Sequence, residues 1–72
     1  MIVTKDNTGE LARMLYERRK ELGLTQRKVA EQAHYNLSGV CRVEYGTMVP
    51  HLDVLCSICE ALNLEIEIRS CE

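Results

Sequence analysis

The sequence lacks the features of a membrane protein, a secreted protein or an enzyme. It contains no run of about 18 or more apolar residues, and a membrane-spanning helix needs such a run. No charged-then-apolar leader opens the chain, so we expect a cytoplasmic protein. The sequence also shows no nucleophile–base–orienter set and no phosphate-cradling loop. We therefore expect no enzyme activity and no cofactor.

The composition fits one small folded domain covering residues 1–72. Apolar residues make up 46% of the chain, which argues against disorder. The net charge of −2 argues against a general polyanion binder, but the charges are unevenly spread. Residues 1–42 hold eight Lys or Arg and five Asp or Glu, whereas residues 43–72 hold one Arg and six Asp or Glu. A basic front half would steer the domain toward phosphates, although Arg18, Arg19 and Lys20 could equally form a solvated helix face.

The stretch from residue 25 to residue 46 has the pattern of two short helices joined by a tight turn. Thr25 is a suitable N-cap for the first helix, because its hydroxyl can accept a bond from an unpaired backbone N–H group. Gly46 is placed to end the second helix in a left-handed conformation. Apolar positions at helical spacing mark the inward face of both helices: Val29, Ala30, Ala33, Val40 and Val43. This arrangement predicts a helix-turn-helix unit.

Helical spacing also predicts one helix before this unit and one after it. The earlier helix should be capped by one of residues 6–8 and end at Gly23. Its apolar stripe is predicted at Leu11, Leu15, Arg18 and Leu22. The later helix should follow Pro50 and run from about His51 to Leu62. Its inner face is predicted at Leu52, Leu55, Ile58, Cys59 and Leu62.

Residues 64–69 change period from 3.6 to 2, which predicts a β-strand with one buried face. A lone strand cannot satisfy its backbone groups, so it needs a partner. The partner is either residues 2–4 of the same chain or the same strand of a second copy. We favour a homodimer in which Leu64, Ile66 and Ile68 of both chains are buried.

Positions from about residue 11 to residue 64 resemble the Xre/Cro-repressor, or lambda-repressor-like, helix-turn-helix family. The matching residues are Leu24-Thr25-Gln26, Val29-Ala30-Glu31, Val40, Arg42-Val43-Glu44, Gly46, Pro50, Leu52, Leu55, Ile58 and Ala61-Leu62. The resemblance implies a mainly α domain of four to five helices, here with a short C-terminal strand. It implies a sequence-specific DNA-binding regulator, a dimeric repressor at a palindromic operator. The tail is similar to that of small antitoxins in the same family, so a protein-interaction module that binds a partner such as a toxin is the alternative.

Two groups of residues are expected to contact double-stranded DNA. The first group would hold backbone phosphates at the start of a helix and beside the turn that follows the reading helix. Its members are Thr25, Gln26, Arg27, Lys28, Tyr45 and Thr47. Arg27 and Lys28 are alternatively plain solvent-facing residues. In the family the residue matching Gln26 holds a phosphate and often also braces the reading helix.

The second group belongs to the helix expected to enter the major groove. Asn36 either caps this helix or reads adenine, and capping is favoured. Leu37 is expected to be exposed and suits a thymine methyl group, Ser38 a base or phosphate, and Arg42 a guanine. Gly39 costs about 1 kcal/mol relative to Ala inside a helix, which would make sense where backbone approaches DNA closely.

The resemblance also implies a pair between Glu44 and Arg19 that links the reading helix to the first helix. The sequence departs from the family at three places. His34 stands where Gly is usual and would need a left-handed conformation, and His51 stands where Ser or Thr usually caps the last helix. Residues 47–49 carry no Lys or Arg, and this apolar loop hints at a protein contact.

The four cysteines present a rival hypothesis. Cys56 and Cys59 lie three apart and could bind zinc with Cys71 and His51, or act as a thiol switch. We favour packing in the core and no metal site, because buried cysteines commonly behave as small apolar residues. Cys41 would lie near the groove, where its oxidation could block binding.

Overall fold

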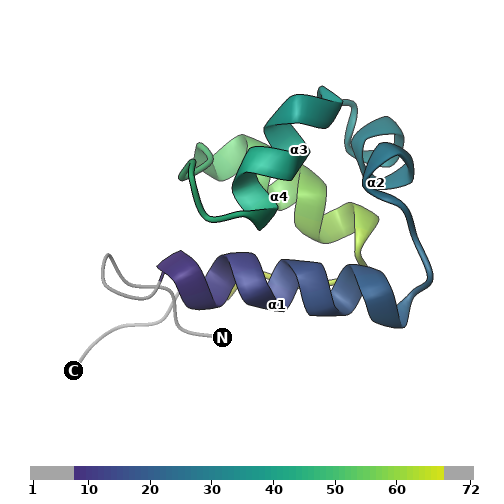
Figure 1. Cartoon of the computed structure of the whole chain (residues 1–72), viewed down its shortest axis with the longest axis horizontal. Helices are drawn as coiled ribbons and strands as arrows, with labels where there is room; N and C mark the ends of the chain where they lie inside the picture. Colours follow the sequence, from purple (N-terminus) through teal and green to yellow (C-terminus); the bar gives the residue numbers. More distant parts are fainter. Residues whose placement is uncertain (1–7, 68–72) are drawn as a thin grey trace.

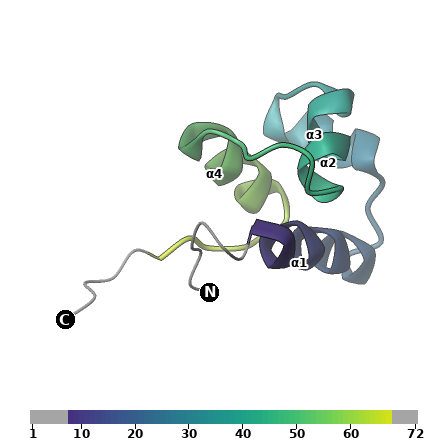
Figure 2. The same ribbon diagram turned by 60° about the vertical axis from the view of Figure 1, so that its left-hand side comes forward.

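The computed structural model describes residues 8–67, which form four helices. They are α1 (Thr8–Glu21), α2 (Gln26–Ala33), α3 (Leu37–Glu44) and α4 (Leu52–Ala61). Helix α1 runs along one side of the molecule, and the other three helices lie on the other side of the core (Figures 1 and 2). Helix α2 contacts both α3 and α4, and α1 contacts α3. The predicted mainly α fold is confirmed, with four helices and no fifth between residues 8 and 67.

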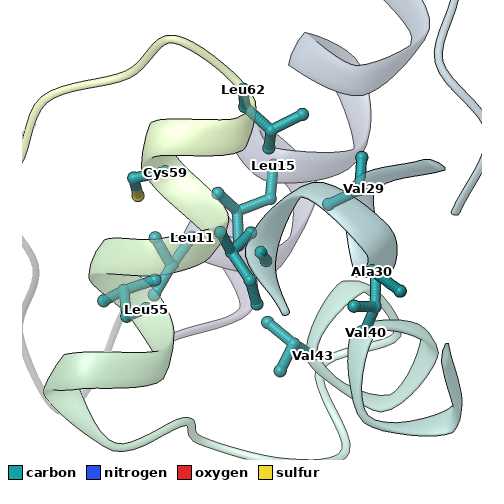
Figure 3. Close-up of a cluster of buried hydrophobic side chains, with 11 residues drawn as sticks. Leu11, Leu15, Val29, Ala30, Val40, Val43, Leu55, Cys59 and Leu62 are labelled. Carbon is teal, nitrogen blue, oxygen red and sulfur yellow. The ribbon is translucent and has the colours of Figure 1, made fainter. Parts of the chain in front are cut away.

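The four helices share one apolar core, shown in Figure 3. Its buried residues are Leu11, Leu15, Val29, Ala30, Ala33, Val40, Val43, Leu55, Ile58, Cys59 and Leu62. Every inward position predicted for the helix-turn-helix unit lies in this cluster, so both stripes of that unit are confirmed. Leu15 of α1 and Leu62 at the end of α4 are completely buried. The core thus joins the first and last helices to the two helices between them.

Two leucines predicted to face the core are instead exposed. Leu22 at the end of α1 is 40% exposed, and Leu52 at the start of α4 is 59% exposed. Helix α1 buries Ala12 and Arg19 in addition to Leu11 and Leu15. Its inward face therefore extends toward residues 12 and 19, and Leu22 is exposed because it lies beyond Glu21, the last residue of α1. Leu52 is the first residue of α4, and the buried residues of that helix begin one turn later, at Leu55.

All four helices end in the same way, with one residue in the left-handed backbone region. The four residues are Gly23 (φ 69°), His34 (φ 55°), Gly46 (φ 74°) and Asn63 (φ 55°). In each case the next N–H group bonds a carbonyl five residues earlier, as in Tyr35 N to Ala30 O at 3.0 Å. This is the Schellman arrangement, which satisfies carbonyl groups that a helix end leaves unpaired. The left-handed conformation predicted for His34 is confirmed.

Residues 64–67 form no β-strand, which corrects the prediction of a strand over residues 64–69. The backbone N–H of Leu64 donates to the carbonyl of Cys59 at 2.8 Å and so completes the end of α4. The Leu64 side chain is half-buried against the core, whereas Ile66 is 37% exposed. Alternation alone does not make a strand when the described part of the chain supplies no second strand to pair with. Ile68 and residues 2–4 lie outside the described residues.

Cys59 packs in the core, as predicted. Burial raises the pKa of its thiol, and the nearby Cys56 raises that pKa further. Between residues 8 and 67 no three His, Cys, Asp or Glu side chains gather where they could hold a metal ion. Cys71, a ligand of the hypothetical zinc site, lies outside this range. No helix in the same range is long and apolar enough to cross a membrane.

The left-handed conformation of His34 leads to a stability prediction. His34 is exposed, and a residue with a Cβ atom pays about 1 kcal/mol to adopt this conformation, a cost that glycine avoids. His34→Gly should therefore raise the free energy of unfolding by about 1 kcal/mol and the melting temperature by roughly 4–8 °C. Thermal unfolding followed by circular dichroism measures this. His34→Ala is the matched control and should give no gain, and equal gains in both variants would contradict the explanation.

Candidate nucleic-acid interface

Side-chain caps fix the start of both helices in the helix-turn-helix unit. The Thr25 hydroxyl accepts a bond from the backbone N–H of Lys28 at 3.0 Å. Asn36 Oδ1 accepts a bond from the backbone N–H of Gly39 at 2.6 Å. The predicted capping roles of Thr25 and Asn36 are thus confirmed. Between the two helices, His34 ends α2 and the chain turns directly into α3.

Gly39 is buried, and its neighbours within the protein explain why no larger residue stands there. A Cβ atom at this position would overlap the ring of Tyr35 and lie 2.8 Å from Asn36 Oδ1. The glycine therefore lets the Tyr35 ring pack against the first turn of α3 while the Asn36 cap stays in place. Close approach of DNA is not needed to account for it, which replaces the reason expected from the sequence.

The outward face of α3 consists of residues three and four apart. Ser38, Arg42 and Tyr45 are exposed, and Tyr45 is 73% exposed. Cys41 lies among them and is half-buried. Leu37 was expected to be exposed, but it is half-buried because it packs against the core. The surface that α3 offers to a ligand is therefore mainly polar and is centred on Arg42.

Polar groups on this surface are already oriented by local hydrogen bonds. Ser38 Oγ donates to Asn36 Oδ1 at 3.2 Å, so the serine oxygen keeps its lone pairs for another donor. The Thr47 hydroxyl donates to the carbonyl of Arg42 at 3.2 Å, and the Thr47 N–H bonds the same carbonyl at 3.0 Å. These bonds hold the exposed ends of α3 in one conformation.

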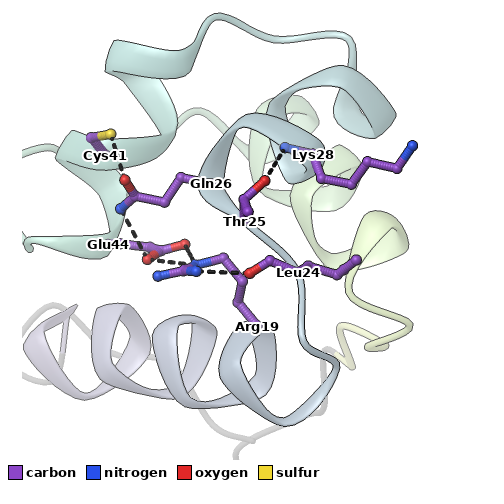
Figure 4. A network of polar contacts seen from close by, with 7 residues as sticks. All are labelled: Arg19, Leu24, Thr25, Gln26, Lys28, Cys41 and Glu44. Atoms are coloured by element: carbon purple, nitrogen blue, oxygen red, sulfur yellow. Dashed lines mark hydrogen bonds and ion pairs between the residues drawn. The ribbon is translucent and has the colours of Figure 1, made fainter.

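A buried polar network fastens α3 to α1 and α2 (Figure 4). Arg19 Nε lies 3.1 Å and 2.9 Å from the two carboxylate oxygens of Glu44, and both side chains are more than nine-tenths buried. Arg19 also donates from Nη1 to the carbonyl of Leu24 at 2.8 Å. Gln26 Nε2 donates to Glu44 Oε1 at 3.3 Å. The pair implied between Arg19 and Glu44 is confirmed, and Gln26 braces α3 as the resemblance implied.

Two of the four basic residues of α1, Arg18 and Arg19, are at least partly buried and bind acceptors within the protein, whereas Arg13 and Lys20 are exposed. Arg18 Nε donates to the carbonyl of Leu62 at 3.0 Å, and Arg13 pairs with Glu17 at 3.0 Å on the surface. Lys20 is exposed, with its ammonium 6.0 Å from the centre of the Tyr16 ring. The excess of basic residues counted over residues 1–42 therefore overstates the charge available to a ligand.

The cations that the helix-turn-helix unit presents to solvent are Arg27, Lys28 and Arg42. Arg27 and Lys28 lie in the first turn of α2, next to the backbone N–H groups that every helix start leaves unpaired. Positive side chains and a helix N-terminus together make a favourable environment for a phosphate group. Glu31, one turn later on α2, is also exposed.

Two polar contacts at this site were not anticipated from the sequence. Arg18 binds the end of α4, and the Cys41 thiol lies 3.0 Å from Gln26 Oε1. The two partners are 44 residues apart in the first contact and 15 apart in the second. Helical spacing predicts contacts only between residues of the same helix, so it indicates neither bond. The position of Arg19 did carry a signal, because residues 11, 15 and 19 follow one another at helical spacing.

A protein-family model described as a helix-turn-helix domain matches residues 10–69. No curated protein matches the chain, and no solved structure does.

The buried network leads to a second stability prediction. Glu44→Gln removes the negative charge that balances the buried Arg19 cation, and such a loss typically costs about 3–5 kcal/mol. Urea unfolding should show this destabilisation. Glu17→Gln breaks the exposed pair with Arg13 and should cost less than about 1 kcal/mol. If the two variants lose similar amounts of unfolding free energy, burial of the Arg19–Glu44 pair is not the reason for its contribution to stability.

Proposed function

We propose that this chain, which belongs to the helix-turn-helix domain family, is a sequence-specific DNA-binding regulator of the Xre/Cro type that acts as a dimeric repressor. One observation carries the proposal: α3 is capped, braced and exposed along one face, beside the cationic start of α2. A helix held this rigidly at the surface suits insertion into a groove. We propose no catalytic role for it.

In this proposal the start of α2 grips the DNA backbone. The free N–H groups at its first turn and the Thr25 hydroxyl would bind a phosphate, and Arg27 and Lys28 would add charge. Gln26 would contribute its remaining amide N–H, because one is already donated to Glu44. Tyr45 and Thr47 would contact the backbone beyond the other end of α3. These contacts fix register and carry no sequence information by themselves.

Base recognition in this proposal falls to the outward face of α3. Arg42 would donate to guanine, and Ser38, whose hydrogen is already directed to Asn36, would accept from a base amino group. Asn36 is exposed and its oxygen holds the cap, so its amide nitrogen would be the group that donates to a base. Leu37 would reach a thymine methyl only with its exposed part, and Gly39 would provide space and make no contact of its own.

A second copy would place the same helix in the next major groove, about 34 Å away on one face of the duplex. Dimerisation through residues Leu64, Ile66 and Ile68 remains the proposed route. Ile66 is exposed and so is available to a partner. Leu64 is already half-buried within its own chain, so it would contribute less than the sequence pattern suggests.

A protein-interaction role, such as that of an antitoxin, is the second candidate. The segment from Tyr45 to the first residue of α4 carries three of the exposed large apolar side chains: Tyr45, Val49 and Leu52 are 73%, 70% and 59% exposed. Residues 45–52 contain no Asp, Glu, Lys or Arg. Such a surface fits a protein partner. Co-purification of a stoichiometric partner, with no DNA affinity in the purified chain, would favour this candidate.

The two kinds of DNA contact predict different effects of two arginine substitutions. Selection from random DNA should return an enriched palindrome. On that sequence Arg42→Ala should cost about 1–3 kcal/mol and relax the preference at one position in each half-site. Arg27→Ala should weaken all sequences about equally and reduce the slope of log K against log[salt] by about one. Gel shifts across a salt series measure both effects, and wild-type behaviour of Arg42→Ala would refute the proposed reading face.

The proposed dimer interface predicts that a substitution at Ile66 lowers the molecular mass of the assembly in solution. Ile66→Lys places a charge in the shared apolar surface, so it should shift the chain from dimer to monomer in sedimentation equilibrium. Leu22→Lys is the matched control, because Leu22 is about equally exposed at the end of α1 and lies outside the interface. A dimer that persists in Ile66→Lys would exclude this route of association.

A further inference from the structure

The buried network does not end at Gln26 but continues to a thiol on the reading helix. Cys41 Sγ lies 3.0 Å from Gln26 Oε1, and Gln26 Nε2 lies 3.3 Å from Glu44 Oε1. Figure 4 shows the two ends of the Gln26 side chain directed at two residues of α3. One glutamine at the start of α2 thus holds α3 at two points, one turn apart.

The direction of each hydrogen bond in this network follows from the charge at its centre. The Glu44 carboxylate, paired with Arg19, has no hydrogen to donate and can only accept. The Gln26 amide must therefore turn its NH₂ group toward Glu44, which leaves its oxygen facing Cys41. An amide oxygen also only accepts, so the thiol is the donor. The buried ion pair therefore determines the orientation of the Gln26 side-chain amide.

Cys41 occupies a position where this bond affects the reading face. It lies three residues after Ser38, immediately before Arg42 and four residues before Tyr45, and all three of these neighbours are exposed. Its own side chain is half-buried because it turns toward α2. The thiol therefore joins the face that would read bases to the helix start that would grip phosphate.

We propose that Cys41 is a positioning residue for base recognition: its thiol donates to Gln26 and thereby fixes the orientation of α3 relative to the start of α2. This inference rests on the proposed DNA-binding function. It assigns Cys41 a role distinct from that of Cys59, which fills the core. It also gives Gln26 two tasks, since the side chain that would approach a phosphate is the one that orients the reading helix.

The test compares Cys41→Ala with Cys41→Ser in the full chain. Alanine removes the donor, whereas serine keeps a hydroxyl donor on a side chain of similar size. Cys41→Ala should lower affinity for the selected operator about three- to ten-fold, as expected if only about a third to a tenth of the molecules then hold α3 in the binding orientation, and change affinity for unrelated DNA less than two-fold. Cys41→Ser should restore operator affinity to within about two-fold of wild type. Cys56→Ala, at a half-buried thiol on α4, is the control and should bind as wild type.

A second readout does not depend on DNA. In the nitrogen–proton NMR spectrum, the side-chain amide signals of Gln26 should be held in one environment in the wild type. They should shift in Cys41→Ala and return close to their original positions in Cys41→Ser, while Cys56→Ala leaves them in place. Thermal stability should fall only modestly in Cys41→Ala, because the helix preference of alanine partly offsets the lost hydrogen bond, so unfolding would not account for the loss of operator affinity.

The two readouts separate failure of this inference from failure of the proposed function. If the wild type binds no DNA sequence preferentially, the proposed function fails, and the NMR comparison still tests the link between Cys41 and Gln26. If Cys41→Ala leaves the Gln26 signals unmoved or binds its operator as tightly as wild type, the positioning role is wrong. Loss of binding in both Cys41→Ala and Cys41→Ser would likewise overturn it, since the donor would then be irrelevant.

Discussion

The arrangement of this small domain depends on the buried ion pair between Arg19 and Glu44. Removing two charges from water is costly, and a buried pair often adds little net stability. Here the cost is offset by further hydrogen bonds: Arg19 also donates to Leu24, and Glu44 also accepts from Gln26. Among residues 8–67, no buried side-chain nitrogen or oxygen lacks a partner. Directional bonds of this kind fix one orientation of α3 on α1, which apolar packing alone would not specify.

Local chemistry at the helix ends complements this long-range bond. A domain of this size has a small core, so conformational freedom at the turns would cost it much of its stability. Side chains of Thr25 and Asn36 cap the two helices of the central unit, and a left-handed residue ends every helix from α1 to α4. The short turn between α2 and α3 is thereby fixed from both sides. The Arg19–Glu44 ion pair then fixes the orientation of the α2–α3 unit relative to α1.

The sequence predicted the central unit well because its signals are local. A capping hydroxyl, a helix-ending glycine and apolar spacing within eight residues each act over one or two turns, and the structure has all of them. The stripe on α1 is harder to place from the sequence, since the predicted residues 11, 15, 18 and 22 and the buried residues 11, 15 and 19 both follow helical spacing; on a helical wheel the centres of the two sets differ by only about 30°. Contacts with other helices decide which residues of α1 are buried.

The reason for glycine at position 39 could not be predicted from the sequence, because it depends on where the Tyr35 ring packs. The tail was misjudged for a related reason: alternation in residues 64–67 describes a strand only when a partner strand exists.

The same bonds also decide how much charge is left for recognition. Arg18 and Arg19 bind acceptors within the protein, and the cations that the helix-turn-helix unit itself presents to a ligand are Arg27, Lys28 and Arg42. Few cations mean few released counterions, and therefore little non-specific affinity for nucleic acid. In the proposed function, an acidic chain with so few exposed cations in this unit would rely on the fit of a fixed helix and on a second copy bound beside it. Under the proposed function, a rigid α3 therefore serves recognition as well as the fold. A loosely held helix would lose conformational entropy when it binds DNA, and the few charges present could not offset that loss.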